Sequence, residues 1–348
     1  MKLRLACAVF AVFASGCSDG DGDGEPAWTQ VFDGDDLDRV VLSVWGSGPD
    51  DVYLVGGGLG GSRGPLLAHY DGSTWKEIAS DAADAFWWVW GTYGAGDQGD
   101  VFAVGEQGAI YRIRNGSAEA MTSPTNLTLF GVWGESPSDL WAVGGDALAQ
   151  PPTAVILRYD GANWTDETPD SSAVPIGGAL NKVWGSSPND VFAVGQNGTV
   201  LHYDGANWAV QQSGVEADKI ILTTVFGASA NDVYAVGGAP ARVLHYDGSA
   251  WSIVNTGIPA SVLNGVSVAP DGEVLVVGNG GVKMRLRDGQ WSDETEQPPF
   301  ADLHAVWLDT SGVAYTVGGN FLAPRGSQRL GAVGYYGTEP PPTSLPSR

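Results

Sequence analysis

Hydrophobic residues recur in short alternating runs along the chain, and these runs form a long-period repeat. The clearest copy is 183–195, VWGSSPNDVFAVG, followed at 201–208 by LHYDGANW. Copies begin 40 to 51 residues apart, at Val44, Val89, Val132, Val183, Val225, Val266 and Val306. This period matches a four-stranded propeller blade and is too long for a leucine-rich or ankyrin repeat. The sequence therefore predicts an all-β fold over residues 27–337, a seven-bladed β-propeller.

Each copy contains four segments with the period-two alternation of β-strands, and no stretch keeps a helical period. The first segment is apolar on both sides, as expected for an inner strand between neighbouring blades. Its tryptophan position holds Trp45, Trp90, Trp133 and Trp184, with Phe226 in the fifth copy. The second segment follows an acidic residue in six copies: Asp51, Asp100, Asp139, Asp190, Asp232 and Glu273. Because catalysis needs a residue once, we predict that these acids are structural and accept turn amides.

Asp-Gly or Asn-Gly joins the third and fourth segments in six copies, which predicts tight hairpins with a positive φ. A tryptophan follows this turn at Trp75, Trp164, Trp208, Trp251 and Trp291. We interpret these rings as blade packing, with a sugar-binding platform as the alternative. The last copy lacks its fourth segment, whereas Trp28 to Phe32 has the pattern of one. We therefore predict that an N-terminal strand completes the last blade and closes the ring.

The first 16 residues have the pattern of a targeting segment. Lys2 and Arg4 precede an apolar run over 5–13, which is too short for a membrane span, and small residues then lead to Cys17. This stretch resembles the lipobox of bacterial lipoproteins. The resemblance implies a signal peptide over 1–16 and lipidation of Cys17. The acidic, glycine-rich residues that follow predict a flexible linker over 17–26. A soluble protein secreted after cleavage nearby is the alternative. Residues 338–348 are proline-rich, and we predict that they are disordered.

Composition and charge narrow the classes of partner. The 40 acidic and 17 basic residues give a formal net charge of −23, which argues against nucleic acid and against broad adhesion to anionic membranes. Leader removal would leave Cys17 as the only cysteine, so the mature chain would form no intramolecular disulfide. The sequence contains no HExxH, GxSxG, paired-cysteine metal motif or phosphate loop. We expect no metal, no cofactor and a monomer whose only membrane contact is the lipid anchor.

The repeats resemble those of a family of secreted bacterial lipoproteins with VWGSSPNDVFAVG and LHYDGxxW motifs, related in pattern to Kelch and BNR-type propellers. The resemblance covers residues 28–337. Paired glycines such as Gly56-Gly57 and Gly144-Gly145 are Kelch-like, whereas the contiguous Asp-Gly departs from the Asp box of BNR repeats. The resemblance implies a propeller in the cell envelope, lipid-anchored at the outer membrane or cell surface. It carries no activity over by motif.

The loops of a propeller lie on two faces. Loops from strand one to two and from three to four share one face, where GSSPND-like and YDG-like turns repeat; we call it the repeated face. Loops from strand two to three and from blade to blade share the other, the variable face. Its variable segments are 58–66, 146–153, 166–182, 219–222, 297–301 and 320–329. Because varied loops on a rigid scaffold are typical of binding surfaces, we predict that this face carries the function.

One column of residues lies two positions before each repeat valine, near the mouth of the channel on the variable face. It comprises Leu42, Trp87, Phe130, Asn181, Thr223, Asn264 and His304, with Trp88 and Lys182 one step later. Aromatic, amide and cationic groups suit a sugar or peptide. Arginines of the loops are candidates for binding a carboxylate ligand: Arg63, Arg242, Arg325 and Arg329. The alternative is that Trp87 and Phe130 plug the channel and His304 is an ordinary polar residue.

Two functions fit this pattern. The first is a non-catalytic, membrane-tethered propeller that binds a glycan, peptide or protein of the cell envelope, and the missing catalytic motifs favour it. The second is a carbohydrate-active enzyme, a glycosidase or lyase, with two carboxylates on the variable face. Acids outside the repeat are the candidates for that role: Glu106, Asp146, Asp170 and Glu216. Nothing in the sequence selects a pair among them, so no catalytic residue is assigned.

Overall fold

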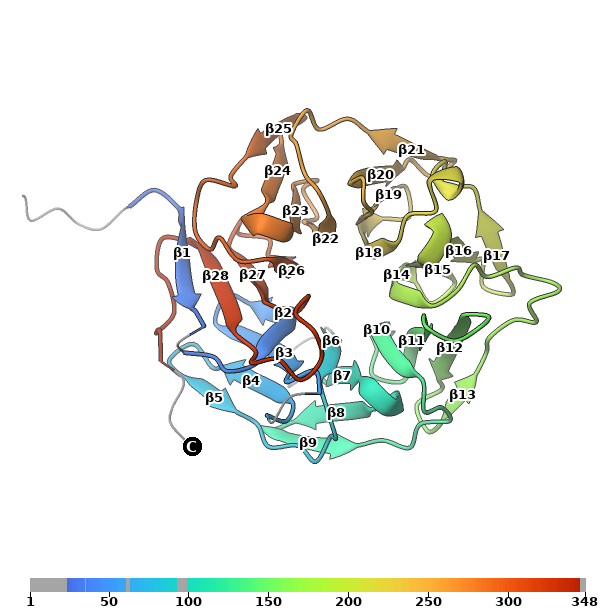
Figure 1. Ribbon diagram of the computed structural model, residues 1–348, viewed down its shortest axis with the longest axis horizontal. Helices are drawn as coiled ribbons and strands as arrows, with labels where there is room; N and C mark the ends of the chain where they lie inside the picture. Colours follow the sequence, from blue (N-terminus) through green and yellow to red (C-terminus); the bar gives the residue numbers. More distant parts are fainter. Residues whose placement is uncertain (1–23, 35, 61–62, 93–98, 345–348) are drawn as a thin grey trace, which may run out of the picture.

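Seven four-stranded antiparallel sheets surround a central axis, each with its first strand innermost (Figure 1). The computed structural model describes residues 24–34, 36–60, 63–92 and 99–344. The predicted signal peptide, Cys17 and most of the linker lie outside these residues. The predicted seven-bladed propeller is confirmed.

The first four blades follow one another in chain order. Blade one consists of β2 (Val40–Gly48), β3 (Asp51–Gly57), β4 (Leu66–Tyr70) and β5 (Trp75–Glu77). Blade two consists of β6 (Phe86–Gly91), β7 (Val101–Gly105), β8 (Ile110–Arg114) and β9 (Ser117–Ala120). Blade three consists of β10 (Thr128–Ser136), β11 (Asp139–Asp146), β12 (Thr153–Tyr159) and β13 (Trp164–Asp166). Blade four consists of β14 (Leu180–Ser187), β15 (Asp190–Gly195), β16 (Val200–Tyr203) and β17 (Trp208–Gln211).

The last three blades complete the ring. Blade five consists of β18 (Leu222–Ser229), β19 (Asp232–Gly237), β20 (Arg242–Tyr246) and β21 (Trp251–Val254). Blade six consists of β22 (Leu263–Val268), β23 (Val274–Gly278), β24 (Lys283–Arg287) and β25 (Gln290–Asp293). Blade seven consists of β26 (Leu303–Leu308), β27 (Ala314–Gly319), β28 (Gly331–Gly337) and β1 (Ala27–Phe32). Short 3-10 turns lie on the variable face: η1 (Glu106–Gly108), η2 (Gln196–Gly198), η3 (Glu216–Asp218) and η4 (Asn279–Gly281).

The N-terminal strand closes the ring as predicted. β1 pairs antiparallel with β28, so that Trp28 lies opposite Tyr336. The Trp28 ring is buried, and its Nε1 donates a hydrogen bond of 2.6 Å to Glu294 Oε2 in blade six. Because β28 runs from the variable to the repeated face, β1 starts at the repeated face and the chain enters the ring there. At the other end, residues 338–344 contain no strand, and Pro341 is buried.

The Val-Trp-Gly element forms the contact between neighbouring inner strands. A Cβ atom at Gly185 of blade four would lie 2.6 Å from the Trp133 ring of blade three, and one at Gly227 would lie 2.7 Å from Trp184. Trp307 lies over Gly46 in the same way and joins blade seven to blade one. The motif therefore pairs a large ring with the absence of a side chain on the next blade.

The repeated acids are structural, but their partners differ from the prediction. Instead of turn amides, Asp51 and Asp190 bind His69 and His202 on the third strand, both at 2.6 Å. Each histidine ring stacks on an aromatic ring of the second strand, as His69 does on Tyr53 at 4.2 Å. Arginines replace histidine opposite Asp100, Asp139 and Glu273. The pairing arises because the second and third strands are antiparallel neighbours.

The Asp-Gly turns form two classes. Asn115-Gly116 and Asp288-Gly289 have positive φ at both residues and make the predicted two-residue hairpins. Elsewhere the loop has four residues, as between Tyr70 and Trp75, and only its glycine has positive φ. The Asp71 carboxylate there accepts hydrogen bonds from the amides of Ser73 and Thr74, two and three residues later. The tryptophans after these turns are buried or partly buried in the blades, as the packing interpretation predicts.

Candidate functional site

The predicted column meets around the mouth of the channel on the variable face, and its polar half links the blades. Asn181 Nδ2 donates to Leu222 O of blade five at 2.8 Å, and Asn264 Nδ2 donates to Leu303 O of blade seven at 2.8 Å. Thr223 Oγ1 lies 3.0 Å from Leu263 O, and His304 Nδ1 bonds Leu42 O of blade one. These four side chains thus form a chain of hydrogen bonds from blade four round to blade one.

The other half of the column is apolar. Trp87 and Phe130 meet edge to face, with ring centroids 5.2 Å apart, and the ring centroids of Trp87 and His304 lie 5.8 Å apart. Together with the polar half and Ile221 they line a cavity of about 210 Å³, which we call the mouth pocket. Its lining residues are Trp87, Phe130, Asn181, Lys182, Ile221, Thr223, Asn264 and His304. Leu42 is fully buried and does not line it.

Lys182 is a buried cation that also lines the mouth pocket. Its Nζ donates to Phe130 O at 2.8 Å and to Asn181 O at 3.2 Å. The ammonium lies 4.1 Å from the ring centroid of Trp88, which is buried in blade two and does not line the pocket. Burial lowers the pKa of Lys182 to about 7.

His304 is held neutral beside this lysine. Burial first, and then the charge of Lys182, lower the pKa of His304 to about 3, although its bond to Leu42 O opposes the shift. A carbonyl oxygen can only accept, so Nδ1 carries the hydrogen of the neutral ring. Phe321, in the loop between β27 and β28, packs edge-on against the His304 ring at 5.0 Å.

That loop, 320–330, reaches across blade one to blade two (Figure 1). Arg325 Nη2 binds Glu106 Oε1 at 2.6 Å, and the same oxygen accepts Trp87 Nε1 at 3.2 Å. Arg329 is buried beneath the loop and donates to backbone carbonyls, Asn320 O and Gly58 O among them. Arg325, predicted as a site residue, therefore stands one carboxylate away from the pocket and orients its aromatic wall.

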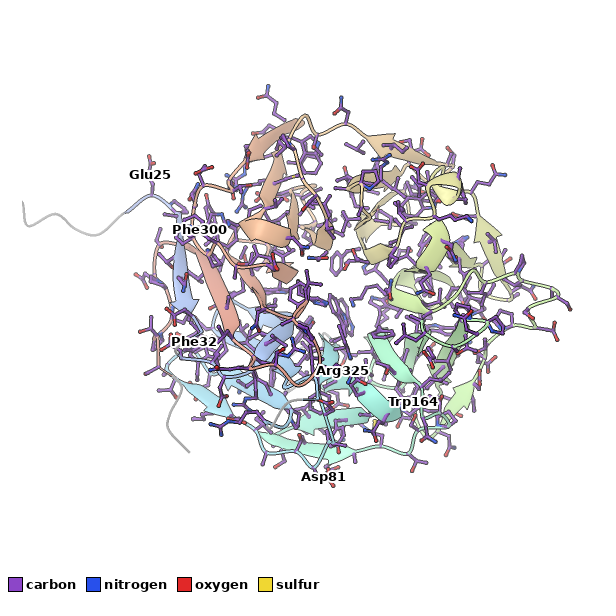
Figure 2. The ribbon with its side chains drawn as sticks, viewed as in Figure 1. Glu25, Phe32, Asp81, Trp164, Phe300 and Arg325 are labelled. Carbon is purple, nitrogen blue, oxygen red and sulfur yellow. The ribbon has the colours of Figure 1, made fainter. Side chains whose placement is uncertain are left out.

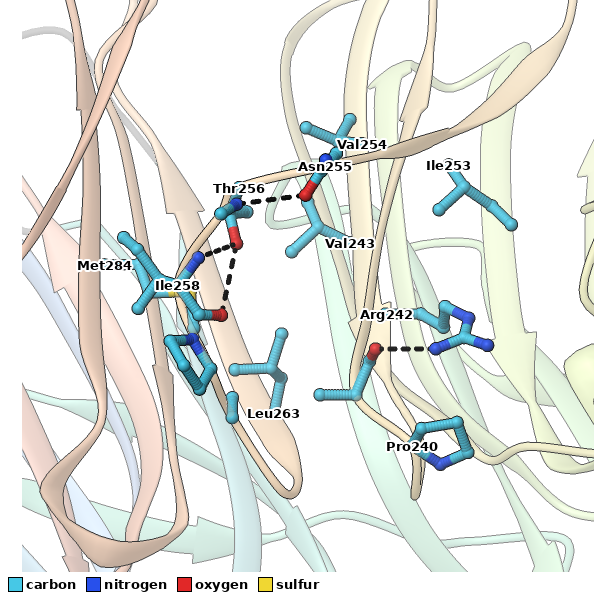
Figure 3. Close-up of a pocket in the computed structure, with 14 residues that line it drawn as sticks. Pro240, Arg242, Val243, Ile253, Val254, Asn255, Thr256, Ile258, Leu263 and Met284 are labelled. Atoms are coloured by element: carbon cyan, nitrogen blue, oxygen red, sulfur yellow. Dashed lines mark hydrogen bonds between the residues drawn. The ribbon is translucent and has the colours of Figure 1, made fainter.

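Arg242 lies apart from the mouth pocket. It lines a groove of about 650 Å³ between blades five and six, with Pro240 and Ile253 on one side and Ile258 and Met284 on the other (Figure 3). The guanidinium donates to Ala241 O and binds Asp218 at 3.1 Å. Leu263 lines this groove and Asn264 the mouth pocket, so adjacent residues of β22 face the two cavities.

Large apolar side chains exposed within the described ranges gather on the variable face. Its loops carry Leu148, Ile221, Phe300, Leu322 and Leu330, while Val210 and Ile253 lie on the outer strands β17 and β21. Phe300 stands near the outside of the ring and Arg325 near its centre (Figure 2). The sequence analysis missed these apolar positions, although the five loop residues lie in or beside segments already recognised as variable.

The acids considered for glycosidase chemistry are engaged by the loops that carry them. Burial disfavours ionisation of Glu216, but bonds from backbone amides and Ser213 outweigh it and hold its pKa below the usual range. The Ser172 hydroxyl and amide likewise lower the pKa of Asp170. Asp146 accepts the amides of Leu148 and Ala149. A glycosidase needs a carboxyl group with a raised pKa, which Glu216 and Asp170 do not supply.

A second hollow opens on the repeated face. Rings of the Val-Trp-Gly elements surround a cavity of about 970 Å³, with Glu135 and Asp309 also lining it. The aromatic residues that line this cavity are Trp45, Trp90, Trp133, Trp184, Phe226 and Trp307. The ring centroids of Phe226 and Trp90 lie 6.1 Å apart, and both rings line this cavity.

Comparison with known proteins gives the fold and no closer relationship. No protein-family model matches the chain, and no curated protein matches it. Among solved structures, YCF48 from Cyanidioschyzon merolae superposes with a TM-score of 0.61 and 16% identity over 88% of this chain and 98% of that one. The structure of YCF48 bound to D1 peptide superposes with a TM-score of 0.61 and 13% identity over 91% of this chain and 100% of that one. The WD40 repeats of RRP9 superpose with a TM-score of 0.65 and 8% identity over 90% of this chain and 99% of that one.

The chain therefore has the propeller fold of YCF48 and WD40 proteins. In the part of the chain that the structure describes, no helix is long and apolar enough to cross a membrane. The same residues contain no group of three or more His, Cys, Asp or Glu side chains placed to hold a metal ion.

Proposed function

We propose that this protein is a non-catalytic, membrane-tethered propeller of the cell envelope that binds a peptide segment of a protein partner on its variable face. The observation that carries the proposal is that five of the seven large exposed apolar side chains in the described residues lie in loops of that face, which also carries the mouth pocket and the groove between blades five and six. Exposed apolar groups beside polar rims are typical of protein-binding surfaces. YCF48, a propeller of similar fold, is seen bound to a peptide.

The path of the chain supports an orientation in which the variable face points away from the membrane. β1 begins at the repeated face, so a lipid on Cys17 would hold that face toward the membrane. The variable face would then point away from the membrane and toward partners. Replacing Cys17→Ala should move the protein from the membrane fraction to the soluble fraction. Retention of the variant in the membrane would contradict the lipid anchor and leave the binding proposal standing.

The binding proposal is tested with the full chain on arrays of envelope-protein peptides and of polysaccharides, with released sugars measured in the same wells. We expect peptide binding without turnover. Phe300→Ser and Leu148→Ser should each weaken binding at least severalfold. Val210→Ser removes an exposed apolar side chain from outer strand β17, away from the loops, and is the control. Binding that resists both loop variants, or any release of sugars, would contradict the proposed function.

A further inference from the structure

Two lysines are buried in the described residues, and they differ in their surroundings. Lys283 Nζ donates to Gly281 O at 2.7 Å and Pro299 O at 3.1 Å, just as Lys182 donates to two backbone carbonyls. Burial lowers the pKa of Lys283 to about 8, but Glu294 and Asp293 are close enough to oppose that shift. No carboxylate acts on Lys182 in this way, since burial alone sets its pKa.

A buried ammonium without a nearby anion is unfavourable, because two carbonyl dipoles and an aromatic face replace only part of its hydration. Lys182 lies within a cavity wall, whereas Lys283 does not line that cavity. An ammonium has three donors, and two are used by Phe130 O and Asn181 O. The third has no hydrogen-bond acceptor among the described residues, and Lys182 lines the mouth pocket.

The other polar groups of the mouth pocket are committed to the ring. Asn264 donates both amide hydrogens, to Leu303 O and to Asn279 Oδ1, and Asn181 Nδ2 donates to Leu222 O. His304 is the titratable group that the pocket places beside Lys182, and with a pKa of about 3 it stays neutral above about pH 4. Glu106 is on the far side of the Trp87 wall, where it pairs with Arg325. Lys182 is thus the cation of this pocket.

We propose that the mouth pocket binds a carboxylate group of the partner, with the Lys182 ammonium as its counter-ion. The walls formed by Trp87, Phe130 and Ile221 suit an apolar body attached to that carboxylate. A cavity of about 210 Å³ has room for several heavy atoms, since one water occupies roughly 30 Å³. This inference rests on the proposed function, because it names the chemical group that the variable face recognises.

Binding of this kind is linked to protonation. The neutral amine that prevails above pH 7 offers no counter-charge, so the affinity for a carboxylate should be greatest below pH 7 and fall as the pH rises. From the pKa of about 7, the protonated fraction at pH 8.5 is about 3%, so affinity should drop about thirtyfold between pH 6 and pH 8.5.

The test titrates three small probes into the full chain and measures binding by calorimetry and by tryptophan fluorescence. N-acetylleucine carries a chain-terminal carboxylate, N-acetylglutamic acid α-amide carries only a side-chain carboxylate, and N-acetylleucine amide carries none. We expect at least one carboxylate probe to bind at least tenfold more tightly than the amide at pH 6. A preference for the first would point to a chain terminus of the partner, and a preference for the second to an acidic side chain.

Lys182→Met keeps the length of the side chain and should abolish both the preference and its pH dependence. Lys283→Met, the matched control, should change neither. Equal binding of acid and amide, or binding by the wild type that is independent of pH, overturns the inference, and these two results need no variant.

The two proposals fail separately. A peptide bound on the variable face that is indifferent to pH and to Lys182→Met would leave the proposed function standing and remove this inference. If the carboxylate probes bind through Lys182 but no peptide or protein partner binds, the carboxylate site stands and the proposed function falls.

Discussion

Trp45 of blade one lies over Gly91 of blade two, where a Cβ atom would stand 2.1 Å from the Cη2 atom of the indole. The tryptophan is buried and Gly91 ends the inner strand β6, so an added methyl group would have to displace the indole or the strand. The contact joins two neighbouring blades, so its disruption should lower the stability of the whole ring.

We therefore predict that Gly91→Ala destabilises the protein by about 1–3 kcal/mol, the usual cost of inserting a methyl group into a packed interior. Gly48→Ala is the control, since a Cβ atom there meets nothing within 4 Å. Urea denaturation of both variants measures the difference. Equal midpoints for Gly91→Ala and the wild type would show that the indole can move aside.

The closing strand offers a second prediction. Trp28→Ala removes a buried ring from β1 together with its bond to Glu294, and should cost about 3–5 kcal/mol. Gln30→Ala changes an exposed residue of the same strand and should cost little. Thermal unfolding distinguishes them. A small effect of Trp28→Ala would mean that the ring does not depend on its last strand.

The buried carboxylate of Asp100 should make stability depend on pH. Burial opposes its ionisation, but Arg114 and Arg112 outweigh burial and hold its pKa below the usual range. A depressed pKa adds stability that is present above the unfolded value of about 3.8 and is lost as the pH falls through the folded value. Asp100→Asn should cost on the order of 3 kcal/mol at pH 7. The difference from wild type should shrink below pH 4 in denaturation curves, and a constant difference would contradict the ion pair.

The lowered pKa of Lys182 should also make stability depend on pH, in a second and more alkaline window. Its folded pKa of about 7 lies below the ordinary 10.5, so between these values the unfolded chain binds a proton that the folded chain lacks. Stability should therefore rise with pH in this window, by at most about 1.4 kcal/mol per unit. Lys182→Met should remove this contribution to the slope. The measurement is the slope of the free energy of unfolding against pH from pH 6 to 9.5. The slope is used because methionine also leaves two carbonyls without a donor, which changes stability at every pH. An unchanged slope would argue against a buried ammonium.

The aromatic wall of the mouth pocket gives a prediction for binding. Trp87 is partly exposed and is held by Glu106 and Phe130, so Trp87→Ala should weaken ligand binding at least tenfold with little loss of stability. A ligand titration and a melting curve on the same preparation separate these effects. A large fall in melting temperature would instead place Trp87 in the core, as the plug considered for this channel.

Repetition made most of the fold predictable. Seven copies of one pattern average out local ambiguity, and the unpaired segments at the two ends of the chain imply the closure of β1 on β28. Repetition also marked Asp190 as structural, although only the register of neighbouring strands shows that it binds His202. The turn after Arg287 differs from the turn after Tyr70 because two residues, and not four, separate its paired strands.

The sequence by itself determined the number of blades, the two faces and the column that meets at the channel, because each depends on period and alternation. Only the tertiary structure decided what those residues do. Asn181 and Asn264 bond neighbouring blades, Arg242 lies in a separate groove, and Lys182 is left beside a cavity without a carboxylate. These outcomes depend on distances between strands about 40 residues or more apart, which closing the ring fixes and no local pattern encodes.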